Sequence, residues 1–521
     1  MRIEVNTVLL RLSGHSFRYE CENLCRLFFP YSPVRVDEEG RPDPGDPAPG
    51  EPWASAEVHN AQGVAGGIDD PDRSYLYQVE VSDGKRVLER SRTAPILTEY
   101  DLTNLLYTAF AELTGYTPAW GMLTGIHPVK LLRQYCEELG EAQGVEKFRG
   151  RGHVSEQKAD LALRVLHAQD PAVKSLSEND FSLYVSIPFC PTRCSYCSFV
   201  SQSVEQSQKL MEPYFDLLLL ELEKTAQVTK SLGLTLCTVY IGGGTPTTLT
   251  AEQLSRLCAK IRSEFDFSRC TEFTVEAGRP DTIDKEKLLA LKAAGVTRIS
   301  INPQSLSDQV LRNIGRRHTV QDVLDAFALA KEAGFQEINA DLIVGLPGDD
   351  LAGFQKTLDG VIALGTANVT VHSLALKRSA RLVSEGGDLS LHRKGEETAA
   401  MVDYSIRRLT EEGFAPYYLY RQTRMAGNQE NTGWAKPGTV CRYNVYTMDE
   451  SNSVIACGAG GVTKLKDPYS DRLERIFNFK FPYEYISRNA EILERKERII
   501  DLYEQFRQRL HEIHQPFGAD Q

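Results

Sequence analysis

Six apolar, strand-like runs alternate with helical stretches between residues 181 and 376, and this alternation is the strongest constraint on the fold. The runs are YVSIPF, CTVYIGGG, EFTVEAG, RISINPQS, EINADLIVGLP and NVTVHSLAL. The stretches between them, near residues 205–231, 251–265, 284–294, 320–333 and 351–364, have the periodicity of amphipathic helices. Strands that are separated by helices pair in parallel through right-handed crossovers. The pattern therefore predicts an α/β fold with an incomplete (β/α)6 barrel.

The residues before this pattern predict a separate α+β region. Short alternating runs flank Asp83-Gly84, which is a hairpin signal, so we expect a small sheet in the first hundred residues. The segment DLTNLLYTAFAELTG then shows helical periodicity, with an expected aspartate cap and a terminal glycine. A charged helix near residues 156–168 leads to Asp170-Pro171, where we expect a domain boundary.

The residues after the pattern predict a smaller C-terminal region. ETAAMVDYSIRRLTEEG is expected as a helix, APYYLYRQ and CRYNVYTM as short aromatic strands, and residues 483–514 as a charged helix. The expected organisation is an N-terminal α+β accessory domain over 1–170, the barrel over 171–390 and a mixed C-terminal extension over 391–521.

Composition and charge exclude several classes of protein. With 59 basic and 71 acidic residues the net charge is -12, which argues against a nucleic-acid partner. The sequence has no apolar stretch long enough to span a membrane and no signal-peptide cleavage site, so we expect a cytoplasmic protein. The 11 cysteines are too few and too scattered for a disulfide scaffold, and for most of them a buried thiol is the default.

Three cysteines depart from that default. Cys190, Cys194 and Cys197 follow the first strand-like run in the segment YVSIPFCPTRCSYCSF. Three thiolates on one loop can each bind one iron of a cubane cluster and leave its fourth iron open. Structural zinc requires four ligands, so a zinc site completed by a distant histidine is the alternative. Phe199, two residues after the last cysteine, cannot be a ligand.

Glycine and polar residues stand at the ends of the later runs, where a barrel places its active site. Gly243 and Gly244 allow the backbone to approach a ligand closely, and Thr245 with the following proline fixes the exit turn. Glu276 could hold an ammonium group or a ribose hydroxyl, or could serve as a capping or salt-bridging carboxylate. Three more polar residues occupy positions where a barrel interior prefers apolar ones and therefore need polar partners: Gln304, Arg316 and Asp341.

These motifs carry a resemblance to a known family. The cysteine motif, with Tyr196 before its third cysteine, resembles the signature of the radical S-adenosylmethionine (SAM) superfamily. YIGGGTPTTL, VEAGRP, INPQS followed by IGRRHT, and DLIVGLPGD resemble the oxygen-independent coproporphyrinogen III oxidase family over residues 180–465. NQENTGWAKPGTVCRYNVYTM and WGMLTGIHPVKL look most like its HemZ-type coproporphyrinogen dehydrogenase branch, so the resemblance covers nearly the whole chain.

The resemblance implies cofactors and an activity. It implies a [4Fe–4S] cluster on the three cysteines, one or two SAM molecules, and conversion of coproporphyrinogen III to protoporphyrinogen IX by a 5′-deoxyadenosyl radical. It also implies a low-potential electron donor such as flavodoxin or ferredoxin and an electron acceptor that it does not identify. The implied SAM contacts are Tyr184, Tyr196, Gly243, Gly244, Thr245, Glu276, Gln304, Arg316, Asp341, Ala375 and Val462.

Departures from the family pattern leave alternatives open. The oxidase branch commonly has a histidine at Ser186 and a fourth cysteine at Phe199, and the haem-chaperone branch also lacks that cysteine. A haem chaperone without oxidase activity and a radical SAM enzyme acting on another tetrapyrrole are therefore the alternatives. Five residues are candidate contacts to substrate propionates: His372, Arg421, Arg424, Lys130 and Arg133. The alternatives are a hydrogen-bonded core residue for His372 and surface residues for the others.

Overall fold

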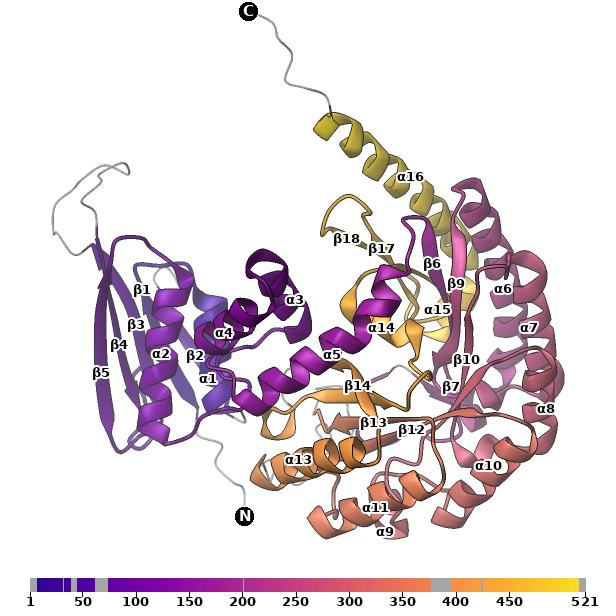
Figure 1. The fold of residues 1–521 in the computed structure, drawn as a ribbon, viewed down its shortest axis with the longest axis horizontal. Coiled ribbons are helices and arrows are strands. Elements are labelled where there is room, and N and C mark those ends of the chain that lie inside the picture. Colours follow the sequence, from indigo (N-terminus) through magenta and orange to yellow (C-terminus); the bar gives the residue numbers. More distant parts are fainter. Residues whose placement is uncertain are drawn as a thin grey trace, which may run out of the picture. The chain divides into compact units, whose positions relative to one another are not determined.

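The computed structural model describes residues 7–30, 32–38, 45–60, 74–199, 201–375, 395–422 and 425–514. The chain divides into two compact units, whose elements are labelled in Figure 1. Unit 1 comprises Met1–Asp160 with Gln422–Arg424, and unit 2 comprises Leu161–Arg421 with Met425–Gln521. Apart from the short segment at 422–424, the residues expected as a C-terminal extension therefore belong to the same unit as the predicted barrel.

Unit 1 is built on a five-stranded sheet with the order β2-β1-β3-β4-β5. The strands are β1 (Val8–Ser13), β2 (Val34–Glu38), β3 (Trp53–Asn60), β4 (Tyr75–Ser82) and β5 (Val87–Ala94). The helices are α1 (Arg18–Phe28), α2 (Glu99–Thr114), α3 (Pro128–Leu139) and α4 (Glu141–Gly152). Strands β4 and β5 form an antiparallel pair, and Asp83-Gly84 lies in the turn that connects them, which confirms the predicted hairpin.

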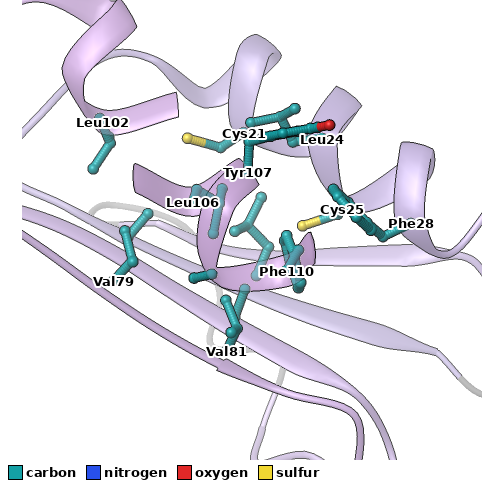
Figure 2. Packing of buried hydrophobic residues seen from close by; sticks show 14 of the residues in the cluster. Cys21, Leu24, Cys25, Phe28, Val79, Val81, Leu102, Leu106, Tyr107 and Phe110 are labelled. Carbon is teal, nitrogen blue, oxygen red and sulfur yellow. The ribbon is translucent and has the colours of Figure 1, made fainter. Parts of the chain in front are cut away.

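The core of unit 1 contains the two cysteines of α1, as Figure 2 shows. Cys21 and Cys25 are fully buried in one apolar cluster with Leu106 and Phe110 of α2. Burial raises the pKa of the Cys21 thiol to about 12, so this thiol stays protonated at neutral pH. The pair forms one buried helical face and behaves as two small apolar side chains, the default that the sequence suggests for most of the cysteines.

Helix α2 is capped differently from the prediction. Its N-cap is Thr98, whose Oγ1 accepts a hydrogen bond from the Asp101 backbone N–H at 3.1 Å. The expected aspartate cap is wrong, because Asp101 lies inside the first turn, where a carboxylate is favoured by the positive end of the helix dipole. Gly115 ends the helix with a φ of 67°, a left-handed conformation that glycine adopts without strain.

Unit 2 contains the predicted parallel barrel strands in an eleven-stranded sheet. Six strands lie side by side in sequence order and pair in parallel: β6 (Asp180–Ile187), β9 (Thr235–Gly243), β10 (Glu272–Gly278), β11 (Arg298–Ile301), β12 (Glu337–Val344) and β13 (Asn368–Ser373). The intervening helices are α6 (Val204–Ser231), α7 (Ala251–Glu264), α8 (Lys285–Ala293), α9 (Asp308–Asn313), α10 (Val320–Glu332) and α11 (Leu351–Ala363). Figure 1 shows these helices along the outer side of the strands. The predicted incomplete (β/α)6 barrel is confirmed, with α9 as an additional short helix.

The C-terminal residues extend this sheet at both ends. At one end β15 (Asn431–Ala435) pairs in antiparallel with β13, and β14 (Ala415–Tyr420) follows it. At the other end β16 (Ser453–Cys457) pairs in parallel with β6, followed by β17 (Val462–Lys466) and β18 (Leu473–Phe477). The C-terminal region also contains the helices α13 (Gly395–Glu411), α14 (Arg442–Asp449), α15 (Pro482–Ser487) and α16 (Asn489–His514). The C-terminal region therefore adds strands to the sheet that contains the barrel strands.

Helix α14 corrects one prediction. The segment CRYNVYTM, expected as an aromatic strand, is helical. The carboxylate of Glu272 accepts backbone hydrogen bonds from Arg442 at 2.7 Å and from Tyr443 at 3.2 Å. These bonds satisfy donors of the first helical turn and place a negative charge at the positive end of the helix. The cap comes from a strand 170 residues earlier, so local sequence did not reveal it.

Helix α5 (Glu156–Lys174) crosses the expected domain boundary. It continues through Pro171, although a proline inside a helix removes one backbone hydrogen bond. Ala172 packs in an apolar cluster of unit 2, so tertiary contacts hold the last turn in place. The division between the two units falls at Asp160, within this helix and before Asp170-Pro171. No helix in the described ranges is both long and apolar enough to cross a membrane.

Candidate active site

The cysteine loop begins where β6 ends and rests on the glycine turn after β9. The backbone N–H groups of Gly244 and Thr245 each donate a hydrogen bond of 2.7 Å, to Ile187 and Phe189 respectively. A Cβ atom at Gly244 would lie 2.6 Å from the Phe189 carbonyl oxygen, so only glycine fits. Thr245 Oγ1 donates a hydrogen bond of 3.5 Å to Cys190 Sγ. The predicted residues Gly244 and Thr245 therefore brace the loop that carries the first cysteine.

The other two cysteines lie further along the same loop. The Ser195 N–H donates to the Ile314 carbonyl at 3.0 Å, and the Cys197 N–H donates to the Cys194 carbonyl at 3.2 Å. Burial raises the pKa of Cys197 to about 11, and the charges of Cys194 and Cys190 act in the same direction. The three thiols are thus close enough to influence one another electrostatically.

Glu276 lies in β10 beside the glycine turn. Tyr240 of β9 donates a 2.6 Å hydrogen bond from its hydroxyl to Glu276 Oε1. A Cβ atom at Gly242 would lie 3.0 Å from the carboxyl carbon of Glu276, so the glycine makes room for this side chain. Burial raises the pKa of Glu276 to about 7, and the negative charge of Asp341 adds to this effect. The carboxyl group can therefore hold or release a proton near neutral pH.

Asp341 lies in β12 and is held in a polar cluster. Asn339 Nδ2 donates to Asp341 Oδ1 at 2.8 Å, and His372 Nε2 lies 3.8 Å from Asp341 Oδ2. Burial alone would raise the pKa of Asp341, but the interactions with His372, Asn339 and Thr370 outweigh it and lower that pKa. Asp341 thus remains a carboxylate while Glu276 is poised to titrate. His372 is placed beside this carboxylate, where it can orient Asp341.

Gln304 has a strained backbone next to the same cluster. Its φ is 67°, a left-handed value that residues other than glycine rarely adopt. The conformation is fixed by two hydrogen bonds to β12, from the Gln304 N–H to the Asp341 carbonyl at 2.9 Å and from the Ile343 N–H to the Gln304 carbonyl at 3.1 Å. Gln304 Oε1 is buried without a hydrogen-bond partner in the described structure. Strain and an unsatisfied buried acceptor are typical of a ligand-binding position.

Arg316 connects the end of α9 with the cysteine loop. Its guanidinium donates to the Asn302 carbonyl at 2.6 Å and to the Tyr196 hydroxyl at 3.1 Å. Arg316 is buried and Tyr196 is partly buried, and Arg316 Nε has no hydrogen-bond partner among the described residues. The structure therefore brings Tyr196 and Arg316, which are 120 residues apart, into direct contact.

An aromatic stack lies between β6, β9 and α14. The rings of Tyr240 and Tyr443 are 4.4 Å apart at an interplanar angle of 21°, and Tyr184 stacks on Tyr443 at 6.2 Å. Tyr184 was predicted from the sequence, whereas Tyr240 and Tyr443 were not. The signal for Tyr443 was hidden because the aromatic segment that carries it was assigned to a strand.

Two predicted residues lie at the margins of this arrangement. Ala375, after β13, forms an isolated antiparallel bridge with Met425. Val462 begins β17 and pairs with Phe477 of β18. The loop before Val462 packs on the end of β6, where Ser186 Oγ donates to the Ala459 carbonyl at 2.8 Å. Gly243 has a φ of 104°, and a Cβ atom at this position would lie 2.8 Å from Ser186 Oγ.

The candidate propionate contacts come from both units. Arg421 is only 5% exposed and donates to the Asn428 carbonyl at 3.1 Å, so it is not the surface arginine of the alternative interpretation. Lys130 and Arg133 lie on α3 of unit 1. Arg424 lies outside the described residues.

Comparisons with known proteins identify relatives of this chain. The family model of the radical SAM superfamily matches residues 184–361. The oxygen-independent coproporphyrinogen-III oxidase-like protein HemZ of Bacillus subtilis is 35% identical over 379 residues, which cover 72% of this chain and 75% of that protein. The haem chaperone HemW of the same species is 33% identical over 58% of this chain and 77% of its own length. Coproporphyrinogen III oxidase (HemN) of Escherichia coli, a radical SAM enzyme, shares the fold with a TM-score of 0.50 and 24% identity, over 63% of this chain and 72% of its own.

The chain belongs to the radical SAM superfamily and, within it, to the coproporphyrinogen III oxidase-like family of HemN and HemZ type. This membership implies a [4Fe–4S] cluster and SAM as cofactors. In the described ranges no three His, Cys, Asp or Glu side chains are arranged to hold a single metal ion. The cluster fits the donor set that is present, three thiols on one braced loop, and SAM fits the unsatisfied acceptor of Gln304 and the partly buried carboxylates.

Proposed function

We propose that the protein catalyses the oxygen-independent oxidative decarboxylation of coproporphyrinogen III to protoporphyrinogen IX. The observation that carries the proposal is the packing of the cysteine loop on the glycine turn after β9, next to the carboxyl group of Glu276, in a chain that is 35% identical to a HemZ protein over 379 residues. When bound, the cluster and SAM supply a 5′-deoxyadenosyl radical for hydrogen abstraction from a substrate propionate. The same proposal includes a cytoplasmic location.

In this proposal each predicted residue has a definite part. Cys190, Cys194 and Cys197 hold the cluster, and Gly243, Gly244 and Thr245 support their loop. The residues that bind SAM are Tyr184, Tyr196, Glu276, Gln304, Arg316 and Asp341. Ala375 and Val462 contact the edge of the SAM site or a second SAM molecule. The aromatic rings of Tyr184, Tyr240 and Tyr443 stack beside Glu276, and the Tyr240 hydroxyl donates a hydrogen bond to its carboxyl group.

Proton control is the chemical contribution of Glu276. Its carboxyl group has a pKa of about 7 because it is buried, and it accepts a short hydrogen bond from Tyr240. The ionised form can bind the ammonium or a ribose hydroxyl of SAM through charge-assisted hydrogen bonds. Binding of a cation at this position would favour the ionised carboxylate, so SAM binding should release a proton from Glu276.

The haem chaperone remains a second candidate because a specific residue favours it. Phe199 stands where the oxidase branch commonly has a fourth cysteine, and its side chain is 66% exposed. HemW relatives of this chain are named haem chaperones, including the one that is 33% identical. A chaperone would keep the cysteine loop but bind haem without converting coproporphyrinogen.

One anaerobic experiment separates the candidates. The reconstituted protein is incubated with coproporphyrinogen III, SAM and a low-potential reductant, first dithionite and then reduced flavodoxin or ferredoxin, with and without added electron acceptors. Protoporphyrin and 5′-deoxyadenosine are measured after oxidation of the products, with the Cys194→Ala variant as the control. The oxidase predicts both products. Stoichiometric haem binding without either product would favour the chaperone, and consumption of haem instead of coproporphyrinogen would indicate another tetrapyrrole enzyme.

A further inference from the structure

Arg279 is a buried cation next to the cysteine loop. The proposed chemistry assigns no role to it. It follows β10 directly and is 3% exposed. A guanidinium is always charged in proteins and is costly to bury unless it is paired and hydrogen-bonded. Its contacts therefore show which group the charge is held against.

One edge of the Arg279 guanidinium contacts the cysteine loop. Nη1 donates to Thr192 Oγ1 at 3.0 Å and to the Thr192 carbonyl at 3.4 Å. The same nitrogen lies 3.8 Å from Cys194 Sγ, within hydrogen-bond range for a sulfur acceptor. A single nitrogen thus holds the backbone of the loop and points a donor at the sulfur of its middle cysteine.

The other edge of the guanidinium is fixed by Asp281. Arg279 Nε and Nη2 donate to the two carboxylate oxygens of Asp281, each at 2.9 Å. This paired geometry holds the planar group in one orientation. His318, whose side chain is fully buried, lies behind it with Nδ1 3.8 Å from Asp281 Oδ1. The negative charge therefore lies on the side of Arg279 away from Thr192 and Cys194.

We propose that Arg279 is a positioning residue that orients Cys194 and raises the reduction potential of the [4Fe–4S] cluster, while Asp281 limits that increase. The proposal rests on the assignment of the cluster to the three cysteines and is independent of the tetrapyrrole substrate. Reduction adds one negative charge to the cluster, and an N–H donor directed at a ligand sulfur stabilises that charge. The effect is strong because Arg279 is shielded from water, where charges interact over a lower effective dielectric constant.

The proposal is tested by the midpoint potential of the cluster, measured in anaerobic titrations followed by electron paramagnetic resonance. Arg279→Gln should shift the potential to a more negative value by at least the equivalent of a tenfold change in the reduction equilibrium, about 59 mV for one electron. Asp281→Asn removes the opposing charge and should shift the potential in the positive direction. Arg279→Lys keeps the charge but not the paired geometry and should lie between wild type and Arg279→Gln.

Arg298→Gln is the matched control. Arg298 is a similarly buried arginine (2% exposed) at the start of β11, paired with Glu337 at 2.5 Å and bonded to the Thr439 carbonyl at 2.8 Å. Its removal should lower the stability of unit 2 and leave the potential at the wild-type value. Iron and sulfide are measured in every variant so that potentials are compared at equal cluster content.

Opposite shifts of the cluster potential in Arg279→Gln and Asp281→Asn distinguish an electrostatic role from a structural one. Loosening of the loop would shift the potential of both variants in the same direction. Equal potentials in wild type, Arg279→Gln and Asp281→Asn, or shifts of the same sign, would overturn the proposal. If Arg279→Gln does not retain its cluster, Arg279→Lys and Asp281→Asn decide in the same way. Full iron content in a variant without the three cysteines would instead refute the cluster assignment itself.

Discussion

The two groups of cysteines in this chain show how the surroundings of a thiol determine its use. Cys21 and Cys25 lie on one face of α1 among leucine and aromatic side chains, with no exposed surface (Figure 2). Cys190 and Cys194 lie on a loop where a threonine hydroxyl and a guanidinium N–H are directed at their sulfur atoms. A thiolate needs such donors, because an apolar cluster favours the protonated form. The difference lies in the partners that the fold supplies and not in the residue type.

The largest expected effect is the complete loss of the cluster. Replacing Cys190, Cys194 and Cys197 together by alanine should abolish bound iron and SAM cleavage, because no other three thiols share one loop. Iron, sulfide and 5′-deoxyadenosine are measured after anaerobic reconstitution. Cys25→Ala is the matched control: it should keep full iron content and cost about 0.5 to 3 kcal/mol of stability through lost packing. Loss of iron in Cys25→Ala would contradict the distinction drawn between the two groups of cysteines.

The next effect is weaker SAM binding. Glu276→Gln and Asp341→Asn should each remove a charge-assisted hydrogen bond worth about 1.5 to 3 kcal/mol, which is roughly tenfold to more than a hundredfold in affinity. Equilibrium binding of SAM to the protein with its cluster measures the loss. Asp101→Asn, a carboxylate in the first turn of α2, serves as the control in unit 1 and should bind SAM normally. Unchanged affinity in both barrel variants would remove these residues from the site.

A pH dependence of stability follows from the same carboxyl group. The pKa of Glu276 is raised to about 7 from an ordinary value of 4.5, so the folded state retains a proton that the unfolded state has lost between these pH values. This contribution to stability is present below the ordinary pKa and is lost as pH rises to about 7. Denaturant midpoints of wild type should fall relative to Glu276→Gln across this range. Asp341, whose pKa is lowered, should contribute in the opposite sense and only at more acidic pH. Parallel pH profiles of the two proteins would show that Glu276 does not titrate as described.

The smallest effect concerns the cap of α2 in unit 1. Thr98→Ala removes the hydroxyl that accepts the Asp101 N–H and should cost about 1 kcal/mol. Thr98→Ser keeps the acceptor and should stay near wild type. Both should retain full iron content and normal SAM affinity, measured beside their unfolding midpoints. A loss of cluster in Thr98→Ala would mean that unit 1 supports the cofactors, which the comparison of the two cysteine groups does not predict.

Much of the barrel could be predicted because its signals are local. Runs of apolar residues, the caps of α7 and α10 and the glycines after β9 all lie within short segments. The cysteine spacing is also local, so the proposed cluster ligands could be selected from the sequence. Glu276 was marked because it stands near the end of a barrel strand, and Gln304 and Asp341 because polar residues are unusual in a barrel interior.

What sequence reasoning missed depends on contacts between distant segments. Helix α14 is capped by Glu272, a residue 170 positions earlier. Because the local sequence does not show this cap, the aromatic residues of the segment predicted a strand. Arg279 was passed over because nothing in VEAGRP shows that its guanidinium reaches Thr192 and Cys194, 87 and 85 residues away. The strained backbone of Gln304 likewise follows from its bonds to β12. None of these partners can be deduced from spacing alone.

The pairing of β16 with β6 has a consequence for synthesis of the chain. The first barrel strand obtains one of its two neighbours from a segment about 270 residues later, as the separation of 273 residues between Ser186 and Ala459 illustrates. At roughly 5 to 20 residues per second, a ribosome needs on the order of 14 to 55 s to deliver that segment. During this interval the edge of β6 has unpaired backbone groups, which are a template for aggregation. The nascent chain therefore has its greatest need for chaperone protection after the cysteine loop has emerged and before the C-terminal strands have followed.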